Sequence, residues 1–467
     1  MDALLFFSIA AFLMFIIVAV MKRSRSRNKE LNLPPGSFGW PLVGETFEFL
    51  RAGVDGEPEE FVRRRVSKHS SQVFKSYIMG ETMVFMCGAA GNKFLFSNEN
   101  KAVTVWWPAS VRKLLGPCLA TSSGEEARLM RRMVTYFLGP DAFSKLYIKT
   151  MDMVSQQHIR THWQGKDVVK VFPTIKRYTF GLACRLFMGL EDDDHIGKLA
   201  SLFNIFLEGI ISLPVNLPGT RFWRGKLATR AIKNEVHKIV RARRSGSEQK
   251  PDLLNHLLNT PDERGKYMTE DVIVNNILML LFAGHDTTSV AITMSIKCLA
   301  ERPDIYDKVF KEHEGIGESV QWEDLQKMKY TWSVACEAMR LAPPVVGGFR
   351  EALIDISYGG YHIPKGWKLF WSSSNTHMDS SLFASSANFE PSRFQESSGP
   401  APFTFVAFGG GQRMCAGKEF ARLEILLLLH NVVKRYRLKL VYPDEKISCD
   451  PMPTPLQGLP VRLQPHD

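Results

Sequence analysis

The sequence has none of the glycine-rich loops that bind nucleotide phosphates. Its densest glycine stretch is FGGGQRMCAG at residues 408 to 417, and Glu419 stands where a phosphate-binding loop needs serine or threonine. A dinucleotide-binding loop is also missing, because Met414 occupies the position of the third glycine. Phosphate binding therefore does not explain why residues 408 to 417 place one cysteine between glycines.

Cysteine is scarce, and the seven that occur are not paired. The count is odd and no two lie close in the sequence: Cys87, Cys118, Cys184, Cys298, Cys336, Cys415 and Cys449. No cysteine or histidine stands at zinc-ligand spacing around Cys415. The pattern argues against a disulfide scaffold or a structural zinc site and fits a reducing compartment, where a thiol is free to act as a ligand.

Concentrated charge, internal repeats and low-complexity tracts are absent too. The net charge is +11, of which residues 1 to 30 contribute five basic minus two acidic groups, or +3, leaving +8 for the rest. This excess is spread along the chain and comes without a nucleic-acid motif, so we expect attraction to anionic lipid and acidic proteins and no nucleic-acid partner. With 45% hydrophobic and 23% charged residues, the chain has the composition of a packed globule.

One long apolar run is present at the N-terminus. Positions 3 to 21 form nineteen consecutive residues without a charge, which meets the ~17–25 residues that cross a bilayer as a helix. A signal peptide is disfavoured because the run is too long, basic residues follow it, and no cleavage site appears. The positive-inside rule puts the basic flank in the cytosol. We therefore expect a transmembrane anchor at 1–21, a basic and proline-rich hinge at 22–46, and a cytosolic domain at 47–467.

Periodicity predicts a mainly α fold with a small β portion. The run from Thr82 to Phe85 and the stretch DISYGGYHIPKGWKLF read as short strands, with turns at Gly359-Gly360 and at 364–366. Most of the remaining sequence has helical spacing. The polar stretch RARRSGSEQKPD at 241–252 is expected to be a surface loop.

The apolar segment at 202–217 is interrupted by proline. Pro214 and Pro218 predict two helices joined by an apolar loop that dips into the bilayer. Ordinary core packing is the alternative reading, and the sequence leaves both open.

A long central helix is predicted from Thr269 to Ala300. Its middle, AGHDTTS at 283–289, places polar residues in an otherwise apolar run, where they would cost ~1–3 kcal/mol each if buried without partners. A locally opened turn that holds water would satisfy them and would let Asp286 and Thr287 relay protons. A solvent-facing polar patch is disfavoured because the flanks are apolar on every face.

The pair EAMR, Glu337 to Arg340, has the spacing of an ion pair on one helix face. The same spacing occurs at five other places, most of which we expect to be solvated bridges. This pair differs in its surroundings, because an apolar helix encloses it, a double proline ends that helix, and Arg393 of FEPSRF can join as a third member. We therefore expect a buried network of these three residues.

Cys415 lies at the start of a long apolar helical pattern. A thiolate there is stabilised by free amide groups and by a bound metal, and one thiolate suffices for haem iron. Arg413 then has a role, because haem carries two propionates that accept from guanidinium groups. A cysteine nucleophile is the alternative, but the sequence places no histidine to support it.

These features together resemble the cytochrome P-450 superfamily of haem-thiolate monooxygenases. Four motifs occur in the family's order: A-G-H-D-T-T at 283–288, E-x-x-R at 337–340, P-x-R-F at 391–394 and F-x-x-G-x-R-x-C-x-G at 408–417. The resemblance implies the family's fold, with a long central helix over haem b, and it covers the chain from anchor to C-terminus.

The resemblance also implies residue roles. For haem binding they are Cys415 as the axial iron ligand, with Arg131, Arg350, Phe408, Gly411, Arg413 and Gly417 around the group. For proton handling they are Asp286 and Thr287, and for the structural network Glu337, Arg340 and Arg393. One departure concerns the family's W-x-x-x-R pattern, because Ala127 stands where tryptophan is usual before Arg131.

A narrower similarity is to plant triterpenoid oxidases of the β-amyrin 28-oxidase kind. It is carried by LPPGSFGWPLVGET at 33–46, GNKFLFSNENKAVTVWWPASV at 91–111 and PPVVGGFREA at 343–352. The chain reads Q-R-M-C-A-G at 412–417 where that family usually reads P-R-M-C-P-G. This implies oxidation of an oleanane, ursane or dammarane skeleton. A sterol, brassinosteroid or diterpenoid hydroxylase of the same superfamily is the alternative.

The implied reaction inserts one atom of O2 into a C–H bond at the endoplasmic reticulum membrane. No NADPH or flavin motif is present, so electrons must come from a separate protein, NADPH-cytochrome P-450 reductase. The substrate pocket is expected from Val103 to Leu119, the apolar segment after 202, and the helix face around Phe282 and Ala283. An O2-independent haem isomerase or dehydratase is disfavoured by the Asp286-Thr287 pair, and a non-catalytic membrane haem-binding protein remains the alternative outside this class.

Overall fold

The computed structural model describes residues 32–466 except 42, 140, 141, 143–146, 247–249, 263, 264 and 396–398. The predicted anchor at 1–21 and the first part of the hinge lie outside these residues.

The helices are α2 (Thr46–Val54), α3 (Glu60–His69), α4 (Gly88–Ser97), α5 (Ala109–Leu115), α6 (Gly124–Phe137), α8 (Ile148–His162), α9 (Val171–Met188), α10 (Asp193–Ile210), α11 (Arg221–Ser245), α12 (Leu253–Asn259), α13 (Glu270–Glu301), α14 (Pro303–Glu314), α15 (Trp322–Lys327), α16 (Lys329–Leu341), α17 (Ser373–His377) and α18 (Lys418–Val433), with short 3₁₀ turns η2 (Pro391–Phe394) and η3 (Gly411–Arg413). The strands are β1 (Val73–Ile78), β2 (Glu81–Met86), β3 (Val103–Val105), β4 (Val168–Lys170), β5 (Gly347–Ala352), β6 (Ile356–Tyr358), β7 (Tyr361–Ile363), β8 (Lys368–Ser372), β9 (Tyr436–Leu440), β10 (Ile447–Cys449), β11 (Pro453–Pro455) and β12 (Pro460–Pro465).

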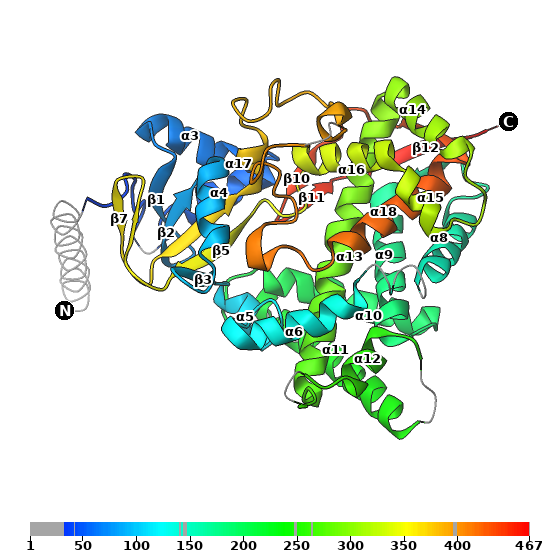
Figure 1. Ribbon diagram of the computed structural model, residues 1–467, viewed down its shortest axis with the longest axis horizontal. Helices are drawn as coiled ribbons and strands as arrows, with labels where there is room; N and C mark the ends of the chain where they lie inside the picture. Colours follow the sequence, from blue (N-terminus) through cyan, green and yellow to red (C-terminus); the bar gives the residue numbers. More distant parts are fainter. Residues whose placement is uncertain are drawn as a thin grey trace, which may run out of the picture.

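The main sheet has five strands in the order β1-β2-β8-β5-β3 and gathers at one side of the molecule (Figure 1). Only the β2–β8 pair is parallel among the pairings of this sheet. The predicted strand at 82–85 is confirmed as part of β2, and the two predicted turns join β6 to β7 and β7 to β8. Gly359 and Gly360 both have positive φ, which explains the glycine pair at the hairpin turn.

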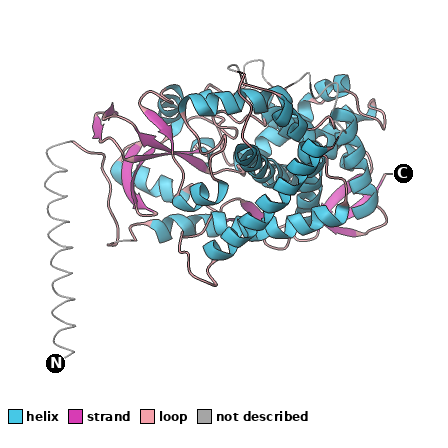
Figure 2. Cartoon of the chain, turned by 90° about the horizontal axis from the view of Figure 1, so that it is seen from below, coloured by secondary structure: helices cyan, strands magenta, loops and turns pink. Residues whose placement is uncertain are grey.

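Outside the main sheet the protein consists mostly of helices, with three small sheets of two or three strands, as a view from below shows (Figure 2). The central helix α13 packs against α9, α11, α16 and α18. Between Ile273 and Ile296 every residue of α13 is buried except Phe282, Ala283, Gly284 and Thr287. Among the described helices, α13 alone has the length and hydropathy of a membrane span, but 78% of its apolar window is buried inside the protein, as expected of a core helix. The prediction of a mainly α fold is confirmed.

The apolar segment after 202 does form two helices and a loop. Phe203, Phe206 and Ile210 of α10 are buried, whereas Leu213 and Leu217 of the loop are 68% and 62% exposed. Core packing is therefore confirmed for the α10 part of the segment, and the loop carries exposed apolar side chains, whose entry into a bilayer stays a prediction.

The prediction of a surface loop at 241–252 is wrong at both ends. The helix α11 continues to Ser245, and Asp252 caps α12 by accepting from the backbone N–H of Asn255. Arg243 lies 2.8 Å from Asp252, and both side chains are nearly inaccessible to solvent. Most of the described residues of this stretch are exposed as predicted, but Arg243 and Asp252 pair with each other at the end of α11 and the start of α12.

The described part of the hinge is attached to the domain. Gly36 bridges to Lys75 of β1, and Glu45 donates its N–H to the carbonyl oxygen of Tyr77. Glu45 also lies 3.0 Å from the guanidinium group of Arg65 on α3. These contacts fix the direction in which the chain enters the domain.

Candidate functional site: the cysteine loop and the central helix

The cysteine loop, residues 408–417, turns sharply before α18. The backbone N–H of Cys415 donates to the carbonyl oxygen of Phe408 at 2.9 Å, which closes the loop. Gly417 is the N-cap of α18, so the thiol of Cys415 lies at a helix N-terminus. Burial raises the pKa of this thiol, and the N–H of Gly417 and the positive charge of Arg131 oppose that rise. Cys415 is nevertheless exposed, so part of its surface is not covered by other residues.

Two glycines of this loop are required by packing. A Cβ atom on Gly411 would lie 2.2 Å from the carbonyl oxygen of Phe96 on α4, and Gly411 has φ +62°. A Cβ atom on Gly410 would lie 2.4 Å from the Phe96 ring. These two glycines therefore allow the loop to pack directly against α4.

Three arginines come together beside the loop, and two of them share one carboxylate. Glu99, which is 1% exposed, accepts from Arg350 at 2.7 Å and from Arg413 at 3.3 Å. Arg413 also donates to two backbone carbonyl groups at 2.8 and 3.2 Å. Burial lowers the pKa of Arg350, and the nearby charge of Arg413 adds to that effect while Glu99 opposes it.

Arg131 of α6 approaches the loop from the other side. Its Nη2 donates to the carbonyl oxygen of Met414 at 2.6 Å. Burial lowers its pKa, the charge of Cys415 opposes this, and Arg413 adds to the lowering. Among the described residues no carboxylate forms an ion pair with Arg131. The structure therefore brings Arg131, Arg350 and Arg413 to one place from three separate elements.

The central helix presents a narrow uncovered stripe. Ala283, Gly284 and Thr287 have helical spacing and lie on one face, while their neighbours are buried. Thr287 Oγ1 donates to the carbonyl oxygen of Ala283 at 2.7 Å. The prediction of an opened helix turn is wrong, because α13 is continuous here and its hydroxyl groups bond to carbonyl groups one turn earlier.

Asp286 lies next to Thr287 in sequence but contacts a different helix. Its Oδ1 lies 2.8 Å from Nζ of Lys176 on α9 and 3.3 Å from Nε2 of His285. Asp286 is 2% exposed, and its Oδ2 has no hydrogen-bond partner among the described residues. The acid and the hydroxyl thus lie on two sides of the helix, with Asp286 tied to α9.

The structure also brings Glu337, Arg340 and Arg393 together. Arg340 donates to both carboxylate oxygens of Glu337 at 2.7 and 2.8 Å, and both side chains are fully buried. Arg393 reaches the same carboxylate at 3.4 Å. Arg340 additionally donates to the carbonyl groups of His377, Ser386 and Asn388. This network ties α16 to the segment that leads toward the cysteine loop.

Comparisons with known proteins agree with this arrangement. The profile of the Cytochrome P450 family matches residues 34–462. The chain belongs to the cytochrome P450 family. It is 50% identical over 463 residues to a β-amyrin 28-monooxygenase, CYP716A378, of Saponaria officinalis, with 97% of this chain and 95% of the relative covered. It is 44% identical to a β-amyrin 6-β-monooxygenase of Solanum lycopersicum, with both chains covered in full.

A solved structure shows the same fold. It is the cyanobacterial P450 CYP120A1 with bound retinoic acid, which superposes with a TM-score of 0.87 at 34% identity and covers 93% of this chain and 100% of its own. The protein is therefore a P450 monooxygenase with a haem-thiolate cofactor, and it uses O2 and electrons from a redox partner.

The charges beside the loop fit that cofactor. Among the described residues, Glu99 pairs with Arg350 and Arg413 and no carboxylate pairs with Arg131, so the three guanidinium groups exceed the carboxylate by two positive charges. Haem carries two propionates, whose charges match this excess. Cys415 would supply the thiol, and Ala283, Gly284 and Thr287 of the α13 stripe are not covered by other residues.

Two residues of this region escaped the sequence analysis. Glu99 organises Arg350 and Arg413 but lies more than 250 positions from either, in a stretch with no recognisable pattern. Lys176 pairs with Asp286 from a different helix. A buried charge without a local partner, as at Asp286, was the one signal that a distant cation should exist.

Proposed function

We propose that this P450 oxidises a polycyclic triterpene, with β-amyrin and its relatives as the first substrates to test. The observation that carries the proposal is the 50% identity, over nearly the full chain, to a β-amyrin 28-monooxygenase. The relatives named above act at two different positions of the same skeleton. The proposal therefore covers the substrate class, and the carbon that is oxidised is left to product analysis.

In this proposal Cys415 provides the axial thiolate, with Gly417 and the α18 N-terminus stabilising its charge. Arg131, Arg350 and Arg413 hold the two propionates, and Glu99 orients the last two of these arginines. Phe408 and Gly411 set the shape of the loop, through the bond to the Cys415 N–H and the contact with α4. When bound, haem with a thiolate ligand supplies O2 activation and C–H oxidation.

Thr287 and Asp286 supply protons to this site. The Thr287 hydroxyl lies on the uncovered stripe of α13, where it would be free to donate a proton into the haem site after leaving the Ala283 carbonyl group. Asp286 is held away from the stripe by Lys176, so it can exchange a proton only if that ion pair opens. Glu337, Arg340 and Arg393 act structurally, since the first two are fully buried on α16 and Arg393 reaches the same carboxylate.

We further propose that residues 1–21 anchor the protein in the endoplasmic reticulum membrane, with 22–46 as hinge and 47–467 as the cytosolic catalytic domain. The attachment of Gly36 and Glu45 to β1 supports a fixed exit of the chain from the domain. The excess positive charge of the domain supports docking of an acidic redox partner, NADPH-cytochrome P450 reductase.

The test uses microsomes that contain the full chain, a plant reductase and a triterpene cyclase. Oxidised oleanane, ursane or dammarane products should appear only with both NADPH and reductase, and their mass spectra assign the carbon. Failure with all three skeletons, alongside turnover of a sterol or diterpenoid, would overturn the substrate class. Cys415→Ser should abolish the thiolate-type spectrum of the reduced, carbon-monoxide-bound protein, whereas Cys449→Ser, on β10, should keep it.

A further inference from the structure

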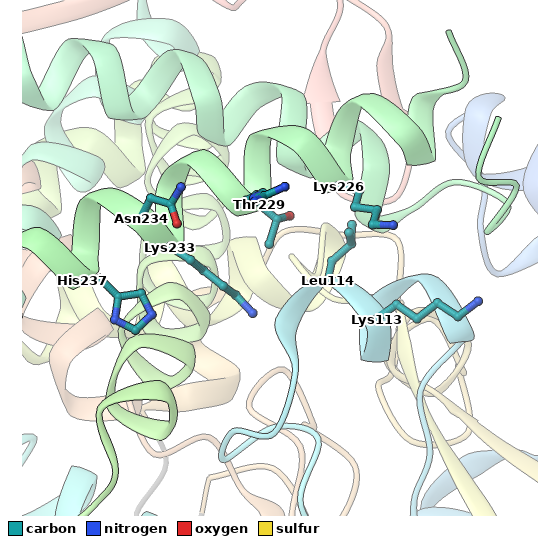
Figure 3. A pocket seen from close by; sticks show the side chains of 8 residues that line it. Lys113, Leu114, Lys226, Thr229, Lys233, Asn234 and His237 are labelled. Carbon is teal, nitrogen blue, oxygen red and sulfur yellow. The ribbon is translucent and has the colours of Figure 1, made fainter. Parts of the chain in front are cut away.

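A cationic pocket lies on the helix α11, away from the cysteine loop. It is a cavity of about 320 Å³ between α5 and α11, and its basic lining residues are Lys113, Lys226, Arg230, Lys233 and His237. Figure 3 shows these side chains, with Lys113 from α5 and the others from α11. None of the eight residues that line the cavity is acidic. The pocket therefore concentrates positive charge without an internal counter-charge.

The positive charge of the pocket comes mainly from basic residues spaced along one face of α11. Lys226, Arg230, Lys233 and His237 follow one another at intervals of four, three and four, which places them on one face. Like charges at such intervals repel one another and destabilise a helix. His237 is held by Glu270 at 2.7 Å, which also accepts from Arg241. That acid is thus already shared between basic groups at the far end of the pocket.

The four other cations have no such partner. Within the described part of the chain, none of Lys113, Lys226, Arg230 and Lys233 lies at ion-pair distance from a carboxylate. Lys233 is partly buried, and its Nζ donates only to the carbonyl oxygen of Leu115 at 3.1 Å. Burial lowers the pKa of Lys233, and the charge of Asp271 opposes this only in part. An anion bound in the pocket would offset both the burial and the repulsion.

An exposed apolar surface adjoins the pocket. Leu227, which follows Lys226, is 49% exposed, and Leu213 and Leu217 of the α10–α11 loop are exposed further. The loop is joined to α5, because Ser110 donates to the carbonyl oxygen of Ile210 at 2.9 Å. Lys113 of the pocket also lies over the ring of Phe222, at 6.0 Å from its centroid, at the start of α11. Exposed apolar side chains thus lie on the two segments next to the pocket, on α11 and on the loop whose start is bonded to α5.

We propose that the cationic pocket binds a phosphomonoester headgroup, as carried by phosphatidic acid, while the adjacent leucines contact the acyl region of the bilayer. Several cations around one cavity suit an anion with several acceptor oxygens. A free phosphate would satisfy the same cations but would have no use for the apolar surface. The proposal rests on the charges of α5 and α11 and does not depend on the substrate class.

The experiment titrates the full-length holoenzyme in non-ionic detergent, by calorimetry at fixed salt, with dihexanoyl phosphatidic acid. Dihexanoyl phosphatidylcholine and inorganic phosphate are titrated separately. We expect one saturable site for phosphatidic acid and binding of the other two weaker by about tenfold or more. The double variant Lys226→Gln/Arg230→Gln should weaken phosphatidic acid binding by about tenfold, and Lys113→Gln on α5 should weaken it independently.

The control removes the same charge elsewhere. Lys439→Gln/Arg462→Gln changes two exposed cations that face each other on β9 and β12, and it should leave binding unchanged. The carbon monoxide spectrum shows that each variant is folded, and the variants on α5 and α11 test the pocket separately. Absence of saturable binding, or equal weakening by the control, would overturn the proposal. Phosphate binding as tight as that of the lipid would assign the pocket to soluble phosphates and overturn the lipid headgroup.

Discussion

The carboxylate of Asp286 lies 2.8 Å from the ammonium group of Lys176, and the two residues belong to different helices, α13 and α9. The pair is the point where the proton-handling segment of the central helix is fastened to its neighbour. Asp286 is almost fully buried and Lys176 is about a quarter exposed. This difference means that the acid depends on the lysine more than the lysine depends on the acid.

Loss of the lysine should therefore destabilise the protein. Lys176→Met leaves a buried carboxylate without its cation, and we expect the free energy of unfolding to fall by about 1–3 kcal/mol, less than for a fully buried pair because water screens Lys176. Asp286→Asn added to Lys176→Met should recover part of the loss in a denaturant titration. Lys238→Met, which breaks an exposed pair with Glu235, should change stability by less than about 0.5 kcal/mol. Equal effects of the two lysine changes would contradict this account.

Thr287 and Thr293 allow the role of the uncovered stripe to be separated from helix structure. Both hydroxyl groups donate to the carbonyl oxygen four residues earlier at 2.7 Å, but only Thr287 lies on the stripe. We expect Thr287→Ala to divert NADPH-derived electrons to hydrogen peroxide and to lower product per NADPH by about tenfold or more. Thr293→Ala should keep the product-to-peroxide ratio of the parent enzyme. If both variants leak peroxide equally, the hydroxyl of Thr287 has no special part in proton delivery.

Arg340 should be far more sensitive to replacement than an arginine in the same sequence spacing at the surface. Lysine cannot donate to Glu337 with two parallel bonds and also reach three carbonyl groups, so Arg340→Lys should cost about 3–5 kcal/mol and reduce haem retention. Arg128→Lys alters an exposed pair of the same spacing with Glu125 and should cost less than about 0.5 kcal/mol. Thermal unfolding of the two variants provides the comparison, and a small loss for Arg340→Lys would be inconsistent with a structural network.

Glu424 of α18 is predicted to make stability depend on pH. It is fully buried, and burial raises its pKa well above the usual range, while the nearby Thr288 hydroxyl partly opposes this. In the unfolded chain the group ionises near its ordinary pKa of 4.5. Above that pH the unfolded state releases a proton that the folded state retains, so the free energy of unfolding falls as pH rises.

The variant Glu424→Gln removes this dependence. Its stability relative to the parent should increase between pH 5 and pH 8, by at most about 1.4 kcal/mol per pH unit. Glu424→Met should show the same increase with pH but a different constant offset, because it changes packing as well. A difference that stays constant over this range in urea titrations would show that Glu424 is not held in its neutral form.

The sequence predicted the parts of the site that local patterns encode. Glu337 and Arg340 stand at fixed spacing in an apolar helix, and Cys415 stands before an apolar helical run, so both could be found without a structure. Glu99 and Lys176 could not, because their partners lie far away in the sequence and no periodic pattern connects them. The fold class could also be predicted, because helix and strand patterns, like the motifs, are visible within a few consecutive residues.

Two errors have a common cause. The opened turn at 283–289 was expected because buried hydroxyl groups need partners, but carbonyl groups of the preceding turn supply them. The stretch at 241–252 was expected to be a loop because it is polar, but its two ends belong to α11 and α12, where Arg243 and Asp252 pair with each other. In both places the sequence showed the need for a partner and left its position undetermined.

The contact of Gly410 and Gly411 with Phe96 has a consequence for biosynthesis. The cysteine loop is among the last parts of the chain to leave the ribosome, whereas α4, against which it is shaped, is among the first. More than three hundred residues are synthesised after α4 before the cysteine loop can pack against it. The cysteine loop can therefore take its final shape only after α4 and the more than three hundred residues between them have been made.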